Sequence, residues 1–419
     1  MELFLWENHE LMHPKEGSRR RMNLKSKWSR FDNRMIVYSI LLFFIYLVFL
    51  IFFVFFWKGK WRTLFSPFGV DFGLFYAAGK MTLSGHVAQI FNVQAHHAVI
   101  EQVLNLKLSY FLPWLYPPIF LLVIIPFALL PFNVALLLWL GLTLALMIFA
   151  ASRMLPKRKK MAIMLLGFPG IFLNFRWGQN GFLSAALLGF AIATMETSPV
   201  FSGVMIGLLA YKPQMAILPF FVLLVTKNWK ALLSAMGTAV SVSLVSLLIF
   251  GKEVWFAFFQ SLFQTSSSLT QASAEVTSAI QPSVLTSLID MKVDSKISVA
   301  IQIIIALCAV VAVCRVFLHA DRMTLKGSML VLGIPLISPY FMQYDLVILA
   351  LPLLLLLYDM MEYGYRKTEI VMLSVLWLFP LVNSTLAIFT NIQICPLVLI
   401  AEMVLVLLRM NRSKTIPAI

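Results

Sequence analysis

The chain has 419 residues, of which 61% are hydrophobic and 12% are charged. Soluble globular proteins carry about 25% charged residues, and one soluble core cannot bury this much apolar surface, so a soluble enzyme is excluded. The formal net charge is +15, from 33 Lys and Arg against 18 Asp and Glu. Lys and Arg gather at the ends of apolar runs, which is typical of a membrane protein and argues against a nucleic-acid partner.

A basic segment, residues 1–35, precedes the first apolar run. This run, Ile36–Trp57, contains 22 residues without a charge and measures about 33 Å as a helix, enough to cross a bilayer. It is too long for a signal peptide, and no small-residue cleavage site follows it. The sequence therefore predicts a first transmembrane helix with the N-terminus in the cytoplasm.

The first run leads into a long outer loop, residues 58–115. Loops of this length usually carry function. Asp71 opens an apolar stretch in which Leu74 and Met81 follow helical spacing, and a second amphipathic stretch covers Val87–Leu104. We expect two short helices lying in the membrane plane, with Asp71 in the first turn of the first one. The alternative for this aspartate is a purely structural helix N-cap.

Eleven further apolar runs follow this loop, so the sequence predicts about twelve transmembrane helices. They are 116–151, 161–177, 181–197, 199–211, 213–227, 230–250, 296–318, 325–338, 341–358, 368–389 and 391–408.

The basic loops between these runs set the topology. Segments such as 153–160 are assigned to the cytoplasm, together with a C-terminal tail at 411–419. The run 116–151 is counted as one crossing; two short helices that meet at Pro131 fit it equally well and would reverse the topology downstream. The predicted fold class is all-α and polytopic, with a single transmembrane domain over 36–410.

Four polar interruptions face the outside on this topology, together with the long first loop. They are 176–180, 211–214, a second outer loop at 252–283, and 338–345. Charged and amide side chains at membrane depth are costly and usually mark a pathway or a site, although a single Lys or Arg can also extend to the interface. The pattern favours an active site at the outer membrane surface.

Metal and nucleotide motifs are weak in this sequence. His97 and Glu101 are four residues apart and face the same way on a helix, as two metal ligands must, but no third ligand has a suitable spacing. A solvated helix face that includes His96 is the simpler interpretation, and we expect no metal and no cofactor. The sequence has no phosphate-binding glycine loop, no CxxC motif and no nucleophile elbow.

Several short motifs occur in a fixed order. They are Asp71-Phe-Gly-Leu-Phe-Tyr-Ala-Ala-Gly, Tyr116-Pro-Pro-Ile-Phe, Gly178-Gln-Asn-Gly, Gly203…Gly207…Lys212-Pro213, Gln281-Pro-Ser, and Ser338-Pro339…Tyr344-Asp345. Over roughly residues 36–350 this order resembles glycosyltransferase family 87 of the GT-C superfamily. The chain departs from the family in two places. Gln343-Tyr344-Asp345 stands where some members carry histidines, and Ile280-Gln281-Pro282-Ser283 replaces the usual Asn-Gln-Ser string.

The resemblance implies a multi-pass enzyme of the cell membrane that works on its outer face. Such enzymes take a sugar, mannose or arabinofuranose among them, from a polyprenyl-phosphate donor. They pass it to a lipid or cell-envelope glycan acceptor with inversion at the anomeric carbon, and the two departures leave sugar and acceptor open. The partners would be this donor, a glycolipid or glycan acceptor, and membrane lipid.

The chemistry needs few charged groups. Asp71 would act as general base toward the acceptor hydroxyl. Lys212 and Arg176 would neutralise the departing phosphate without a metal, and this anionic leaving group requires no general acid. Further hydrogen bonds to sugar or phosphate are expected from Tyr76, Tyr116, Gln179, Asn180, Tyr340, Gln343 and Asp345.

Two other classes of function remain as alternatives. One is a transporter or flippase of lipid-linked glycans, although the inverted repeat typical of transporters is not seen in the sequence. The other is a non-catalytic membrane partner. Transfer of sugar from a polyprenyl-phosphate donor in vitro would distinguish both from an enzyme.

Overall fold

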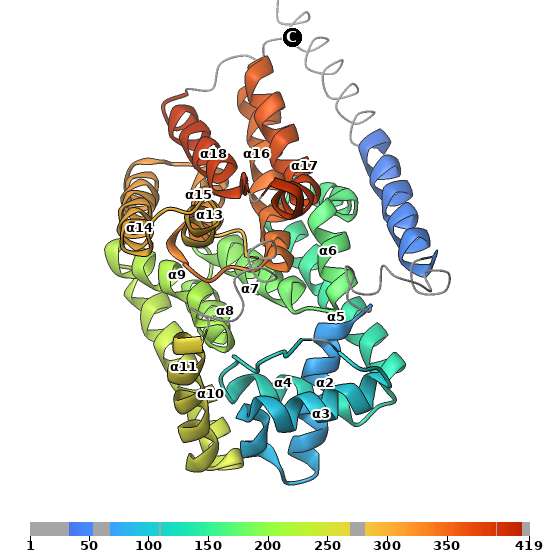
Figure 1. Ribbon diagram of the computed structural model, residues 1–419. Helices are drawn as coiled ribbons and strands as arrows, with labels where there is room; N and C mark the ends of the chain where they lie inside the picture. The colour runs from blue at the N-terminus through green and yellow to red at the C-terminus, as the bar shows by residue number, and fades with distance from the viewer. Residues whose placement is uncertain (1–32, 53–67, 109, 269–280, 391, 413–419) are drawn as a thin grey trace, which may run out of the picture.

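The computed structural model describes residues 33–52, 68–108, 110–268, 281–390 and 392–412, and these residues form helices and connecting segments without a β-strand (Figure 1). The predicted cytoplasmic N-terminal segment and C-terminal tail therefore lie almost entirely outside the described residues. So do residues 53–57 at the end of the first predicted crossing and residues 58–67, 109 and 269–280 of the two outer loops.

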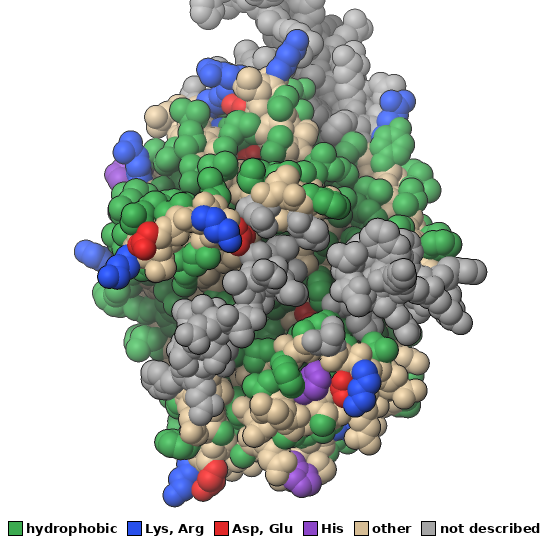
Figure 2. Space-filling model, in the orientation of Figure 1, with side chains coloured by type: hydrophobic (Ala, Val, Ile, Leu, Met, Phe, Trp, Pro, Cys, Tyr) green, Lys and Arg blue, Asp and Glu red, His purple; other side chains and the backbone are tan. Residues whose placement is uncertain are grey.

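Five helices in the described part of the chain are long and apolar enough to cross a membrane. They are Asn33–Phe52, α5 (Phe132–Met154), α10 (Trp229–Phe250), α14 (Ser295–His319) and the continuous stretch Gln343–Tyr363, which comprises η6 (Gln343–Leu349) and α16 (Ala350–Tyr363). Figure 2 shows large areas of hydrophobic surface on one face, and side chains such as Leu248 on α10 are 83% exposed. Because water would not tolerate such a surface, the protein is a membrane protein.

Each remaining predicted run also contains helix, in pieces shorter than a crossing except for α17, which has 24 residues. These are η3 (Lys159–Gly167), α6 (Pro169–Trp177), α7 (Gly181–Thr194), α8 (Pro199–Leu208), η4 (Leu209–Tyr211), α9 (Pro213–Val225), α15 (Met323–Ile337), α17 (Lys367–Thr390) and α18 (Cys395–Met410). The helices α6 to α9 contain 9, 14, 10 and 13 residues, fewer than the ~20 that a crossing needs. The junction of α6 with α7 at Gln179 and Asn180 and the start of α9 at Lys212 are buried, whereas Glu196, between α7 and α8, is exposed.

The run 116–151 divides before Pro131 into α4 (Ile119–Ala128) and α5. Pro131 has an extended backbone and precedes the first residue of α5, a position where its missing N–H costs no helical hydrogen bond. With 10 residues, α4 rises about 15 Å, half the thickness of the hydrocarbon core. The run therefore holds one helix of crossing length and one short helix.

The first outer loop contains α2 (Val70–Leu83), η2 (Val87–Phe91) and α3 (Val93–Leu104). The expectation of an amphipathic helix in the membrane plane is wrong for α2, because this helix is buried on all sides except at Lys80, Thr82 and Leu83. A helix that is apolar all round belongs in a core. Here α2 packs against α3 and α4 at one end of the molecule (Figure 1).

Two glycines on α8 let it approach α10 closely. A Cβ atom on Gly207 would lie 2.5 Å from the carbonyl oxygen of Ala235, and Gly203 is equally close to Ala231. Small residues four apart on facing helices are typical of membrane-helix packing. The Gly203…Gly207 motif therefore has a packing role and leads directly to Lys212 at the start of α9.

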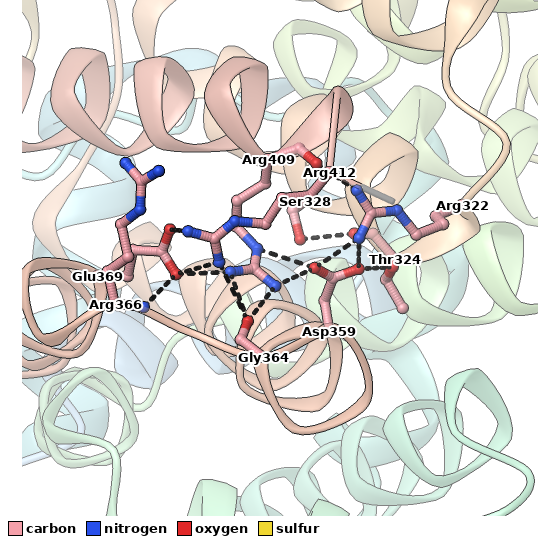
Figure 3. Close-up of polar contacts among 9 residues, drawn as sticks. All are labelled: Arg322, Thr324, Ser328, Asp359, Gly364, Arg366, Glu369, Arg409 and Arg412. Atoms are coloured by element: carbon pink, nitrogen blue, oxygen red, sulfur yellow. Dashed lines mark hydrogen bonds and ion pairs between the residues drawn. The ribbon is translucent and has the colours of Figure 1, made fainter. Parts of the chain in front are cut away.

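An ionic cluster joins four helices at the end of the molecule opposite α2 (Figures 1 and 3). Arg409 on α18 donates to Asp359 on α16 at 2.6 and 2.8 Å and to Glu369 on α17 at 2.6 Å. Arg322, just before α15, pairs with Asp359, and Arg412 pairs with Glu369. The side chains of Arg409 and Asp359 are both fully buried. Because buried charges need an opposite charge beside them, each of the two stabilises the charged form of the other.

Replacement of Arg409 by leucine is expected to lower the free energy of unfolding by about 3 kcal/mol, the lower end of the range for a broken buried pair, because Arg322 and Arg412 remain. The thermal midpoint in detergent measures the change. Arg412→Leu is the matched control and should cost less, since the Arg412 side chain is 20% exposed. Equal midpoints for the two variants would contradict the role given to Arg409.

Candidate active site

Asp71 is buried at the beginning of α2, with 6% of its surface exposed. It is not the N-cap: that position belongs to Gly69, which has φ +71° and whose N–H donates to the Arg176 carbonyl at 2.9 Å. This bond fixes the start of α2 against α6. The carboxylate thus lies in the first helical turn, where the helix dipole favours negative charge.

The Gln179 side chain connects Asp71 to the rest of the site. Its Nε2 donates to Asp71 Oδ2 at 3.1 Å. Its Oε1 accepts from the Asn180 N–H at 2.9 Å and from the Tyr116 hydroxyl at 3.3 Å. Because two donors hold the oxygen, the amide nitrogen is directed at the Asp71 carboxylate.

Lys212 and Asp345 form a buried ion pair beside this amide. The Lys212 Nζ donates to Asp345 Oδ1 at 2.5 Å and to Asn180 Oδ1 at 2.9 Å. The two charged side chains are 4% and 1% exposed, and the ammonium also lies 5.2 Å from the centre of the Tyr344 ring. Asp71 and Lys212 are therefore joined through the adjacent residues Gln179 and Asn180.

A tight turn between α6 and α7 presents these two residues. Gly178 has φ +70°, and a Cβ atom on it would lie 2.8 Å from Cβ of Phe72. Asn174 donates to the Gln179 carbonyl at 3.2 Å and accepts from the Gly181 N–H at 2.9 Å. The sequence analysis missed Asn174, although an amide inside an otherwise apolar helix was a signal for it.

Arg176 and Tyr340 are two further residues of the predicted site. Arg176 places its guanidinium 5.1 Å from the centre of the Trp177 ring, and its charge lowers the pKa of Asp71. Burial, and then the charges of Asp345 and Asp71, raise the pKa of Tyr340, so this side chain lies within electrostatic range of both carboxylates.

Gln343 and Tyr76 complete the predicted set. Gln343 is 3% exposed and begins η6, two residues before Asp345. The Tyr76 hydroxyl instead donates to the Leu130 carbonyl at 2.7 Å. Tyr76 therefore ties α2 to the end of α4 and does not join the polar cluster.

The histidines of α3 have structural partners. His96 is fully buried, with its Nε2 3.1 Å from the Leu74 carbonyl oxygen, so the expected solvated face is wrong for this residue. His97 lies 3.4 Å from Glu101, which also accepts from the Leu108 N–H at 2.9 Å. Among the residues that the structure describes, no three His, Cys, Asp or Glu side chains are placed to hold a metal ion.

The electrostatic surroundings of Asp71 suit a base. Burial raises the pKa of Asp71 to about 7, the hydrogen bond from Gln179 and the charge of Lys212 lower it, and the charge of Asp345 raises it. A general base works best when its pKa is near the working pH. The site thus holds a carboxylate poised for proton transfer next to a buried ammonium group.

Asp71 should make stability pH-dependent. Since its pKa is raised from 3.8 to about 7 in the folded protein, its contribution is fully present below pH ~4 and is lost as the pH rises through ~7, by up to about 1.4 kcal/mol per pH unit. The thermal midpoint of Asp71→Asn should therefore rise relative to that of the wild type as the pH increases from 5 to 8. Parallel midpoint curves in this range would show that the pKa is not raised.

Comparison with known proteins identifies a family for the middle of the chain, a part that does not include Asp71 or Asp345. A model of glycosyltransferase family 87 matches residues 114–339, more than half of the chain. The match includes Tyr116, the turn at Gln179 and Asn180, and Lys212. No curated protein and no solved structure matches the chain. The chain belongs to glycosyltransferase family 87 and is a membrane glycosyltransferase.

Proposed function

We propose that this protein transfers a sugar, mannose or arabinofuranose, from a polyprenyl-phosphate donor to a lipid or cell-envelope glycan acceptor. The observation that carries the proposal is the linked pair of opposite charges: the Asp71 carboxylate and the Lys212 ammonium share one buried network through Gln179 and Asn180. A base and a phosphate-binding cation are the two groups that this reaction requires.

The reaction is a single displacement at the anomeric carbon. The acceptor oxygen forms a bond to this carbon while the bond from the carbon to the phosphate oxygen breaks, and the electron pair stays on the phosphate. The acceptor proton passes to the Asp71 carboxylate, which later releases it to water. The products are an inverted glycoside and polyprenyl phosphate, whose negative charge makes a general acid unnecessary, in contrast to glycoside hydrolysis.

The remaining polar groups bind the donor in this mechanism. Lys212 and Arg176 attract the phosphate. Asn180 has a buried Nδ2 for which the described residues provide no acceptor, and a donor oxygen would satisfy it. Tyr116, Gln179, Tyr340 and Gln343 line the same cluster, whereas Tyr76 is used by Leu130.

The same proposal includes a GT-C-like fold with about twelve crossings and an active site on the outer face of the cell membrane. It is supported by the position of α2, α3 and α4 at one end of the molecule and of the arginine cluster at the other (Figure 1). Two short helices that follow one another, such as η3 and α6, together account for one crossing. Basic clusters favour the cytoplasmic side.

Asp71→Asn tests the base. Asparagine keeps the shape and an acceptor oxygen but loses basicity, so turnover with a polyprenyl-phosphate sugar should fall about 10²–10⁴-fold. Asp294→Asn is the matched control, because Asp294 is an exposed N-cap of α14 and asparagine caps equally well. Near-normal turnover in Asp71→Asn would exclude this residue as base, and donor movement without transfer would favour a flippase.

Lys212→Met tests the phosphate contact. Since the charge of the phosphate is present in both the ground state and the transition state, this variant should raise KM for the donor as well as lower kcat. Steady-state kinetics over a range of donor concentrations measures both constants. A change in kcat alone would assign Lys212 a role other than donor binding.

Impermeant thiol labelling in intact cells tests the orientation. With the native cysteines replaced, a cysteine at Gln94 on α3 should be labelled and one at Arg158 before η3 should not. Labelling at position 158 with protection at 94 would place the active site on the cytoplasmic face.

A further inference from the structure

The Lys212 ammonium is already neutralised in the structure. Its Nζ lies 2.5 Å from Asp345 Oδ1, and both side chains are almost completely buried. A buried ammonium without an anion is strongly unfavourable, and Asn180 offers only a neutral oxygen at 2.9 Å. Asp345 is therefore the counter-ion that keeps Lys212 charged while no donor is bound.

We propose that Asp345 competes with the donor phosphate for Lys212, and that it thereby sets donor affinity and promotes release of the polyprenyl-phosphate product. Asp345 is then a positioning residue that acts through Lys212. This inference rests on the proposed function.

The two partners differ in how firmly they are held. Asp345 belongs to η6, where its N–H donates to the Met342 carbonyl at 2.9 Å. The η6 segment packs tightly on the turn of the site: a Cβ atom on Gly181 would lie 2.8 Å from the Tyr344 carbonyl oxygen. Lys212, by contrast, carries its charge on a flexible four-carbon stem. When the pair opens, the ammonium moves and the carboxylate stays.

The ammonium has one N–H for which the described residues provide no acceptor. It has three N–H donors, and the described residues take two of them, at Asn180 and Asp345. A phosphate oxygen can therefore approach the third donor while Asp345 is still bound.

During the reaction, negative charge moves from Asp71, which accepts the acceptor proton, to the phosphate, while the net charge of the site stays the same. Before transfer, Asp71 and Asp345 stand against Lys212 and Arg176, and a phosphodiester donor adds one negative charge. Transfer converts this diester to a monoester with a greater negative charge, next to the fixed Asp345 carboxylate. Like charges at close range repel, so Asp345 favours departure of the product and the return of Lys212 to its resting partner.

Asp345 also acts on the base. Its charge raises the pKa of Asp71, while the charges of Lys212 and Arg176 and the hydrogen bond from Gln179 lower it. On α3, the nearest imidazole, His96, is engaged with the Leu74 carbonyl, and the apolar helix α4 contributes no charge. Removal of the Asp345 charge should therefore shift the acid limb of the pH–rate profile to lower pH.

The test is the affinity of purified protein for a short-chain polyprenyl phosphate in detergent, measured by calorimetry. Asp345→Asn should bind this carrier roughly tenfold or more tightly than wild type, the scale of coupling between close charge pairs. The KM of Asp345→Asn for the donor should fall, and its kcat should fall where product release limits turnover. The acid limb of its pH–rate profile should move to lower pH. Asp345→Glu, which keeps the charge, should bind the carrier less tightly than Asp345→Asn does.

A second comparison shows whether the effect passes through Lys212. Lys212→Met should bind the carrier more weakly than the wild type. The double variant Lys212→Met with Asp345→Asn should bind it no more tightly than Lys212→Met alone. If Asp345→Asn does not fold, Asp345→Ser supplies the same neutral position. If a folded variant with a neutral residue at position 345 binds the carrier no more tightly than the wild type, the inference is wrong. The proposed function would still hold in that case if carrier binding by the wild type depends on Lys212. Absence of both carrier binding and transfer in the wild type would overturn the two together.

Discussion

The buried ion pair of Lys212 and Asp345 is the contact on which the arrangement of the site depends. It joins the start of α9 to η6, across 133 positions of sequence. Neither charge could stay in this apolar interior without the other. Once the pair is in place, Asn180 has its oxygen on the ammonium, and the amide of Gln179, one residue earlier in the chain, meets Asp71 on a third helix.

Apolar packing supplies the other half of the site. Phe75, one turn after Asp71 on α2, lies among Trp114, Tyr116, Phe120 and Trp139 in a cluster with ring centres 5.0–6.2 Å apart. Aromatic pairs in edge-to-face contact are rigid and bury much surface. This packing removes water from the Asp71 carboxylate, and the loss of water is the main reason why its pKa rises.

Much of this could be read from the sequence, because it depends on local patterns. The apolar runs gave the helices, and polar breaks in them gave Asp71, the 178–181 turn, Lys212 and Asp345 as candidates. The pairing of Lys212 with Asp345 was not predicted, because no local pattern encodes a contact between distant segments. Arg409 was missed for a related reason: at the end of a run it looked like any positive residue near the cytoplasm.

The wrong prediction for α2 and the shortness of the helices α6 to α9 have a common cause. A short apolar helix has the same sequence signature whether protein or lipid surrounds it, and only the packing of neighbours decides. The apolar surface of α2 packs against α3 and α4 and not against a membrane. The junctions of α6 with α7 and of α8 with α9 likewise lie inside the protein, and at the first of them Asn174 donates to and accepts from backbone groups.

The ionic cluster at the opposite end also constrains the order in which the protein can mature. Asp359 and Glu369 are synthesised before their partner Arg409, which lies 50 and 40 positions further along the chain. At the usual rate of synthesis this interval lasts several seconds, during which Asp359 can pair with Arg322 while Glu369 must remain in contact with water near the end of its helix. The ionic cluster can close only after α18 has been inserted. A ribosome that stalls within α18 would therefore leave a membrane protein with open, charged helix ends, a form that cellular quality control can distinguish from the finished molecule.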